Sequence, residues 1–129
     1  MDIQIEKKNV ALHFGLDFMD EINALSGLDV NGVNIGAGAV TEQQKLEIGD
    51  PTALARVIYA ASKGSSPRPS LDMVKQHVEA IHDEAELQGL FDEALEAIKN
   101  SFPLQFQLKK MQKTAKEAER KAGAINATK

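Results

Sequence analysis

The stretch that most constrains the fold is "DPTALARVIYAA", residues Asp50 to Ala61. Asp50 is a good helix N-cap, because its carboxylate can accept the unpaired backbone N–H groups of the first turn. Pro51 suits the first helical position. On such a helix one narrow stripe is polar and nearly every other direction is apolar, so other elements must surround it. The sequence therefore predicts a central core helix, with Gly64 as a left-handed stop.

The N-terminal residues alternate between apolar and polar side chains. Ile3 and Ile5 alternate with polar neighbours, and Val10, Leu12 and Phe14 repeat the pattern after a polar "KKN" turn. Alternation with period two is typical of a β-hairpin with one apolar face. A lone hairpin is marginal in water, so we expect this face to pack on helices.

Most of the remaining chain repeats apolar residues at intervals of three and four, which indicates amphipathic helices. Ser70, after the linker "GSSPRPS", can cap one of them. Gly89 falls inside another, where it predicts a close packing contact. The expected helical segments lie at Phe18–Leu25, Ala39–Ile48, Leu71–Ile81 and Leu87–Ile98, and from Leu104 onward.

These patterns predict an α+β fold that is mainly α, with the N-terminal β-hairpin packed on a bundle of about five helices. We expect residues 1–111 to form a single helical domain and residues 112–129 a basic tail that is helical or disordered. The glycine-rich stretch Leu28–Gly38 reads as a simple loop. It lacks the Gly-Lys-Ser/Thr ending of a Walker A motif, and it does not lie in the strand–turn–helix unit of a dinucleotide-binding fingerprint.

Charge is divided unevenly along the chain. Lys109–Lys129 contains seven basic and two acidic residues, a net charge of +5, whereas the preceding residues carry −9. A basic tail on an acidic body predicts that the tail contacts a protein, a nucleic acid or the body of a neighbouring copy.

Several classes of protein are disfavoured by composition. The chain has no cysteine, which excludes a disulfide framework, a thiolate metal site and a cysteine nucleophile. Its first residues lack the apolar core of a signal peptide, and no apolar run approaches the roughly 20 residues of a membrane span. We therefore expect a soluble cytoplasmic protein without membrane contacts.

No catalytic, cofactor-binding or metal-binding residues can be assigned. His77 and His82 are predicted to lie on one helix about 140° apart, flanking its apolar stripe on opposite sides, which is unsuitable for metal binding. His13 has no nucleophile or paired carboxylate fixed beside it. Asp92 and Glu96 share a helix face, and such acidic faces are usually solvated. We expect no enzyme activity and no cofactor.

The last helix offers the best candidate for partner binding, because a detachable amphipathic helix can leave an apolar groove for a partner helix. A nucleic-acid-binding regulator acting through Lys109–Lys121 is the alternative. It is disfavoured because no aromatic residues interleave for base stacking and the acidic body repels phosphate. The candidate residues are Phe102, Phe106, Leu108 and Met111, with the cations Lys109, Lys110 and Lys113.

Five weak motifs occur in a recognisable order and spacing. They are "VALHFGLDFMDEI", "GVNIGAGAV", "DPTALARVIYAAS", the "RPS" break and "LQGLFDEALEAIKNS". Together, over roughly residues 1–111, they resemble the tail assembly chaperones of long-tailed siphophages that infect Gram-positive bacteria.

The resemblance implies a non-enzymatic role in the host cytoplasm. Such chaperones bind the tape measure protein, keep it soluble while the tail tube assembles, and are absent from the finished virion. It also implies a longer, frameshifted form of this chain as a partner and is compatible with a homo-oligomer. No individual binding residue can be transferred from the family.

Overall fold

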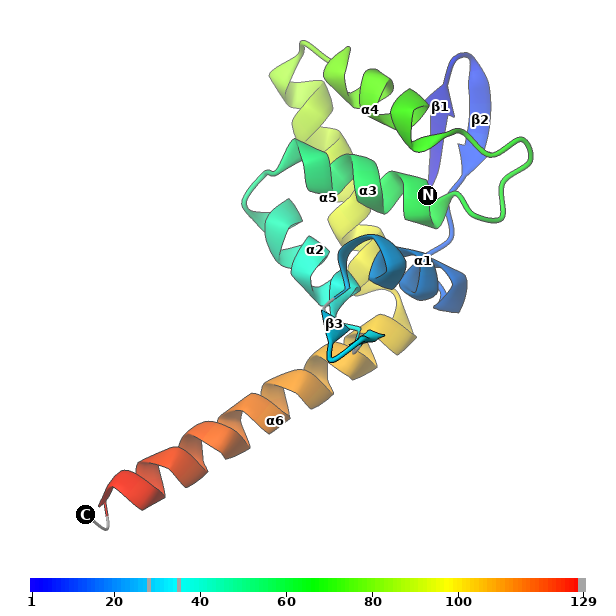
Figure 1. Ribbon diagram of the computed structural model, residues 1–129. Coiled ribbons are helices and arrows are strands. Elements are labelled where there is room, and N and C mark those ends of the chain that lie inside the picture. Colours follow the sequence, from blue (N-terminus) through cyan, green and yellow to red (C-terminus); the bar gives the residue numbers. More distant parts are fainter. Residues whose placement is uncertain (28, 35, 128–129) are drawn as a thin grey trace.

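The computed structural model describes residues 1–27, 29–34 and 36–127, which form six helices and two β-hairpins (Figure 1). The predicted α+β class, mainly α, is confirmed. The structure has one helix more than the predicted bundle of about five. In chain order the elements are β1 (Asp2–Ile5), β2 (Lys8–Ala11), α1 (Leu16–Ser26), β3 (Asp29–Val30), β4 (Val33–Asn34), α2 (Gly38–Glu47), α3 (Pro51–Ala61), α4 (Leu71–Glu79), α5 (Glu84–Lys99) and α6 (Phe102–Ala127).

Helix α3 lies at the centre of the fold, as predicted, with α1, α2, α4 and α5 packed against it. Asp50 is its N-cap and accepts hydrogen bonds from the Thr52 backbone N–H at 2.9 Å and the Thr52 hydroxyl at 2.7 Å. The helix ends at Ala61, where the Ser62 hydroxyl donates to the Tyr59 carbonyl at 2.6 Å. The predicted left-handed stop at Gly64 is wrong, because the serine already satisfies a terminal carbonyl and Gly64 does not have a positive φ.

The hairpin β1–β2 packs its apolar face on the helices, as predicted. Ile3 is paired with Val10, and both side chains are buried together with Ile5. The turn is made by Glu6 and Lys7, which both have positive φ, so it begins one residue before the predicted "KKN". The register explains the difference, because Ile5 must reach the core and is paired with Lys8.

A second hairpin, β3–β4, lies in the stretch that was predicted to be a simple loop. Asn31 and Gly32 have φ values of 52° and 81° and connect the two short strands. Two successive positive φ values are the signature of a type I′ turn, which Asn-Gly favours strongly. The "VNGV" sequence is therefore the signal that the loop prediction missed, while residues 28 and 35 lie outside the described residues.

An ion pair buried between α2 and α3 was not anticipated. The Glu42 side chain is 0% exposed, and its Oε2 atom lies 3.1 Å from both Nε and Nη2 of Arg56. Lys45 Nζ lies 3.8 Å from the other carboxylate oxygen. Because a buried carboxylate without a cation is very costly, this pair fixes how α2 sits on α3.

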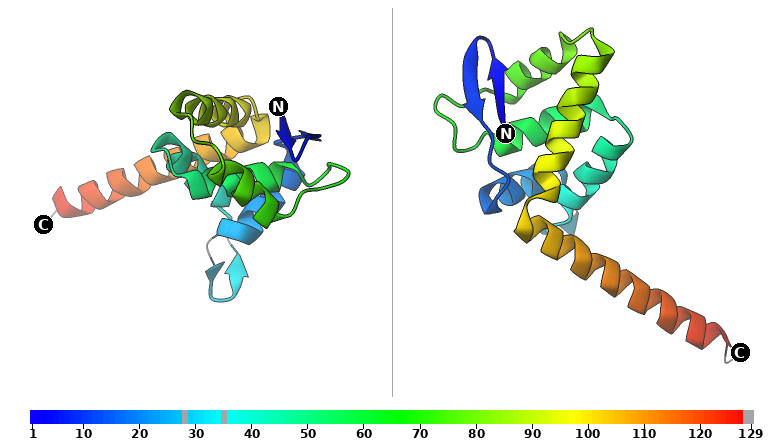
Figure 2. Two further views of the ribbon diagram at one scale, coloured as in Figure 1. Left: turned by 90° about the horizontal axis from the view of Figure 1, so that it is seen from above. Right: turned by 180° about the vertical axis from the view of Figure 1, so that it is seen from behind.

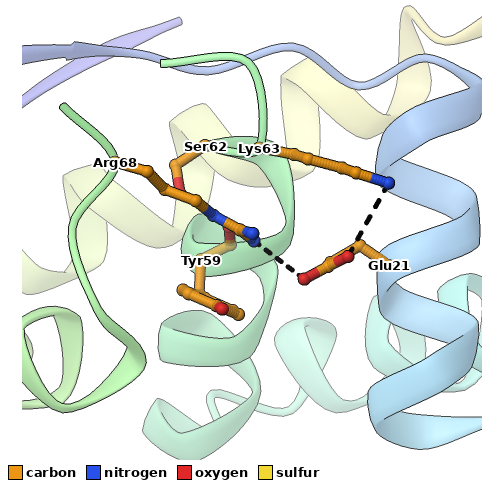
Figure 3. Close-up of polar contacts among 5 residues, drawn as sticks. All are labelled: Glu21, Tyr59, Ser62, Lys63 and Arg68. Atoms are coloured by element: carbon orange, nitrogen blue, oxygen red, sulfur yellow. Dashed lines mark hydrogen bonds and ion pairs between the residues drawn. The ribbon is translucent and has the colours of Figure 1, made fainter. Parts of the chain in front are cut away.

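The predicted linker after α3 is held to the body by Arg68 (Figure 3). Its guanidinium donates to Glu21 Oε1 at 2.9 Å and to the Tyr59 carbonyl at 3.0 Å, and its central carbon lies 3.9 Å from the Tyr59 ring centroid. Lys63 Nζ lies 3.9 Å from Glu21 Oε2. One planar cation thus ties the linker to α1 and α3, a geometry that suits arginine better than lysine.

Two glycines within helices have opposite surroundings. A Cβ atom on Gly38 would lie 2.7 Å from the backbone oxygen of Ile22, so this glycine allows α1 and α2 to approach closely. A Cβ atom on Gly89 would have no neighbour within 4 Å. The predicted close packing contact at Gly89 is therefore wrong, and the close helix contact occurs at Gly38.

The cap of α3 gives a pH-dependent prediction. The hydrogen bond from the Thr52 hydroxyl lowers the pKa of Asp50 below its usual value. The cap therefore stabilises the fold above the unfolded-state pKa, and this stabilisation is lost as pH falls through the folded-state pKa. We expect Asp50→Ala to lower the free energy of unfolding at pH 7 by about 1 kcal/mol, as measured by urea denaturation. The difference in the free energy of unfolding between this variant and the unsubstituted chain should shrink below pH ~4. An equal difference at pH 3 and pH 7 would contradict this account.

The glycines give a second prediction, with opposite signs at the two sites. Gly89→Ala should raise the free energy of unfolding by about 0.5–1 kcal/mol, because alanine loses less backbone entropy in a helix and its methyl group meets nothing. Gly38→Ala should lower the free energy of unfolding, because its methyl group collides with backbone. Thermal denaturation of both variants is the measurement, and stabilisation by Gly38→Ala would show that the α1–α2 contact is looser than described.

Candidate functional site

Helix α6 begins on the body and then leaves it. The Ser101 hydroxyl donates to the Phe14 carbonyl at 2.6 Å, which fixes the start of α6 beside the start of α1. Leu104 is fully buried, and Leu108 packs against the core. Farther along, α6 extends away from the other helices as a single rod (Figures 1 and 2). Helix α6 therefore continues through residue 111 without a break. The division into a domain at residues 1–111 and a tail at residues 112–129 stays a prediction.

The side of α6 opposite Leu104 begins with two exposed aromatic rings. Phe102 is 79% exposed and Phe106 is 57% exposed. At about 100° per residue the two rings are some 40° apart around the helix, so they form one surface. Leu16, at the start of α1, is also 68% exposed, and the Ser101–Phe14 hydrogen bond brings that end of α1 to this end of α6.

The same side of α6 continues as a row of cations. Lys109, Lys113, Lys116 and Arg120 all lie within about 40° of the direction of Phe102 around an ideal helix. Lys110 Nζ lies 5.8 Å from the Phe106 ring centroid, within the range of a cation–π contact. We call this surface the outer stripe; its residues are Phe102, Phe106, Lys109, Lys113, Lys116 and Arg120.

The structure divides the predicted partner-binding residues between two faces of α6. The phenylalanines and lysines lie on or beside the outer stripe, whereas Leu108 and Met111 lie on the side that starts against the body. Met111 is 38% exposed. Whether any of these residues binds a partner stays a prediction.

Sequence reasoning missed two exposed apolar residues. Leu16 and Ile48 are large apolar residues that are 68% and 83% exposed, whereas Arg120, which extends the outer stripe, was already part of the predicted basic segment Lys109–Lys121. The i, i+4, i+7 and i+11 spacing of the cations could have revealed the stripe. Nothing in the local pattern could have shown that Leu16 and Ile48 stay uncovered.

The histidines are placed differently from the prediction. Helix α4 ends at Glu79, so His82 lies in the connection to α5 and does not share a helix with His77. Asp92 accepts a hydrogen bond from Gln88 Nε2 at 3.0 Å. Over the described ranges, no three His, Asp or Glu side chains come together in a group that could hold a metal ion.

The helices of the described part of the chain do not include one long and apolar enough to cross a membrane. The sequence model of the family described as "Phage tail assembly chaperone protein, TAC" matches residues 2–113. Comparisons with curated proteins and with solved structures gave no match. The family match spans both hairpins, the central helix and the first half of α6, including the rings of the outer stripe. This chain therefore belongs to the phage tail assembly chaperone family.

Proposed function

We propose that this chaperone binds the tape measure protein through the outer stripe and keeps it soluble while the tail tube assembles around it. It acts in the host cytoplasm and is absent from the finished virion. Membership of the tail assembly chaperone family supports the general role. That family is a non-catalytic kind of protein, which supports a function in binding.

The observation that carries the proposal is the exposure of Phe102 and Phe106 on a helix that leaves the body. A tape measure protein presents long amphipathic helices, which aggregate through their apolar faces. Aromatic anchors that remain uncovered in the free protein are typical centres of binding energy. The apolar face of a client helix could pack on Phe102 and Phe106, while the lysines of the outer stripe pair with acidic side chains farther along the client.

Two further partners follow from the same proposal. A longer, frameshifted form of this chain would present the same body and could bind beside it. Several copies could also cover one extended client, because each copy has its own outer stripe. The number of copies per client is then set by client length.

The outer stripe can be tested by removing its two rings. We expect Phe102→Ser combined with Phe106→Ser to weaken client binding by at least about 30-fold, because each ring is a candidate hot spot worth about 1–2 kcal/mol or more. The folded chain should be nearly unaffected, because both side chains are exposed. The measurement is co-expression with the tape measure protein, followed by quantification of soluble client and of the co-purified complex.

Ile48→Ser is the matched control, because Ile48 is 83% exposed but lies at the end of α2 and away from the outer stripe. It should leave the soluble client unchanged. If both variants lose soluble client equally, binding would rest on nonspecific hydrophobic contact. If the variant without the two rings keeps as much client soluble as the unsubstituted chain, the outer stripe is not the binding surface. If the unsubstituted chain fails to keep the client soluble, the tape measure role itself is wrong.

The row of cations on one helix face favours nucleic acid as a second candidate ligand. Titration of duplex and single-stranded DNA at two salt concentrations separates the alternatives, because phosphate contacts make affinity fall steeply with salt. Replacing Lys109, Lys113 and Lys116 with glutamate would abolish such binding. We expect no salt-dependent DNA binding by the unsubstituted chain, because its body is strongly acidic.

A further inference from the structure

The first hairpin has an edge that is not covered by another strand, because β1 pairs with β2 alone among the described strands. Along an antiparallel ladder, every second residue of a strand exchanges hydrogen bonds with the residue opposite. The Leu12 N–H donates to the Met1 carbonyl at 2.8 Å, which fixes the bonded positions. Ile3 and Ile5 are in step with Met1, so their backbone groups also bond to β2.

The backbone groups of the alternate residues, Asp2 and Gln4, consequently point away from β2. We call the N–H and C=O groups of these two residues the free edge of β1. Across the described ranges, no backbone or side-chain group forms a hydrogen bond with this edge. A strand edge with unpaired donors and acceptors is a template for one more strand.

A cleft of about 360 Å³ lies beside the free edge. Its described lining comes from β1, from the end of α4 with the residues that follow it, and from α5, but not from β2. Figure 2 shows that β1 is the strand of the hairpin nearer to α5. The apolar part of the lining is formed by Ile3, Ile81 and Leu90. Because paired strands lie about 4.8 Å apart, a strand added to the free edge would enter this cleft.

The α5 wall of the cleft contains Gly89. Glycine destabilises a helix interior relative to alanine, so its presence needs a reason. A Cβ atom at this position would meet nothing within 4 Å, so packing inside the chain does not require glycine. The absent side chain instead leaves room for the backbone of an incoming segment to approach α5.

The margin of the cleft is acidic. Asp2, Glu86 and Glu93 are exposed there, and the described residues that line the cleft include no lysine or arginine. These carboxylates favour an occupant that carries cations. The basic segment of this chain is unsuitable, because it forms helix α6 and its backbone groups are already bonded within the helix.

We propose that the cleft between β1 and α5 binds an extended, lysine- or arginine-bearing segment of another protein, which adds as a third strand to the free edge of β1. Backbone hydrogen bonds supply the affinity, and alternate side chains of the segment enter the cleft beside Gly89. Its cations pair with the acidic margin. The inference is independent of the proposed function, because the cleft lies on the hairpin and α5, whereas the outer stripe lies on α6.

Amide hydrogen exchange, measured by NMR on the isotope-labelled chain, tests the strand addition. The probe is a peptide of about seven residues, blocked at both ends, in which valine alternates with lysine, so that it can extend along all of β1. At saturating peptide, exchange at the Asp2 and Gln4 amides should slow by about tenfold or more. The Ile3 and Ile5 amides should change little, because they are already bonded to β2.

Two control peptides separate strand addition from other modes of binding. N-methylation of every second amide keeps the side chains but removes donors that a third strand needs, so it should abolish the slowed exchange. Glutamate in place of lysine should weaken binding by about tenfold or more, because like charges then meet at the margin. Equal binding of the N-methylated peptide would overturn the strand addition, and equal binding of the glutamate peptide would overturn the preference for cations.

The cleft itself is tested by Gly89→Leu, with Gln88→Leu as the matched control on the same helix but outside the cleft. Leucine at position 89 enters open space, so the chain should fold at least as stably while peptide binding weakens by about tenfold or more. The control should bind the peptide as the unsubstituted chain does. Undiminished binding by Gly89→Leu would overturn the assignment of the cleft.

The unsubstituted chain alone provides the remaining test. Without peptide, exchange at the Asp2 and Gln4 amides should not depend on protein concentration. If it slows as concentration rises, a second copy covers the free edge, and the assignment to another protein is wrong. If no slowing occurs even with the valine–lysine peptide at about 1 mM or above, the free edge does not accept a strand and the proposal fails.

Discussion

The fold depends on the need to cover α3 on almost every side. Its apolar side chains are essentially removed from solvent, and several of them are alanines, which let neighbouring backbones come close. The rest of the body follows from that demand: four helices surround α3, and the hairpin is fastened to its end where the His13 N–H donates to the Ala61 carbonyl at 2.9 Å. Burial of this size supplies the hydrophobic gain that a domain of about one hundred residues needs to offset its conformational entropy.

Polar contacts then decide how the covering elements are oriented. Glu42 and Arg56 join α2 to α3 inside the body, and Arg68 joins the linker to α1 and α3 at its edge. Both contacts use a guanidinium, whose fixed planar donors can serve two acceptors or stack on a ring at once. Apolar packing alone tolerates some sliding of one helix over another, whereas a buried carboxylate that must stay beside its cations does not.

Local signals were sufficient to predict α3, its Asp50 cap, the Ser70 cap and the first hairpin, because each depends on neighbours in sequence. The type I′ turn at Asn31–Gly32 was equally local, and its short strands were obscured by the surrounding glycines. The Glu42–Arg56 pair and the crowding at Gly38 could not be predicted, because they exist only once α1, α2 and α3 are packed. For the candidate site, the sequence identified the right helix, but which of its faces remains uncovered is decided by where Leu104 and Leu108 find the core.

The protruding part of α6 also determines how the molecule moves through solution. Residues 109–127 extend for about 28 Å as a helix, at a rise of 1.5 Å per residue. A compact body with such a rod meets more friction than a sphere of the same 14.0 kDa mass. It tumbles anisotropically, slowest about axes perpendicular to the rod. On a column calibrated with globular standards, even a single copy would therefore elute as though it were a larger particle.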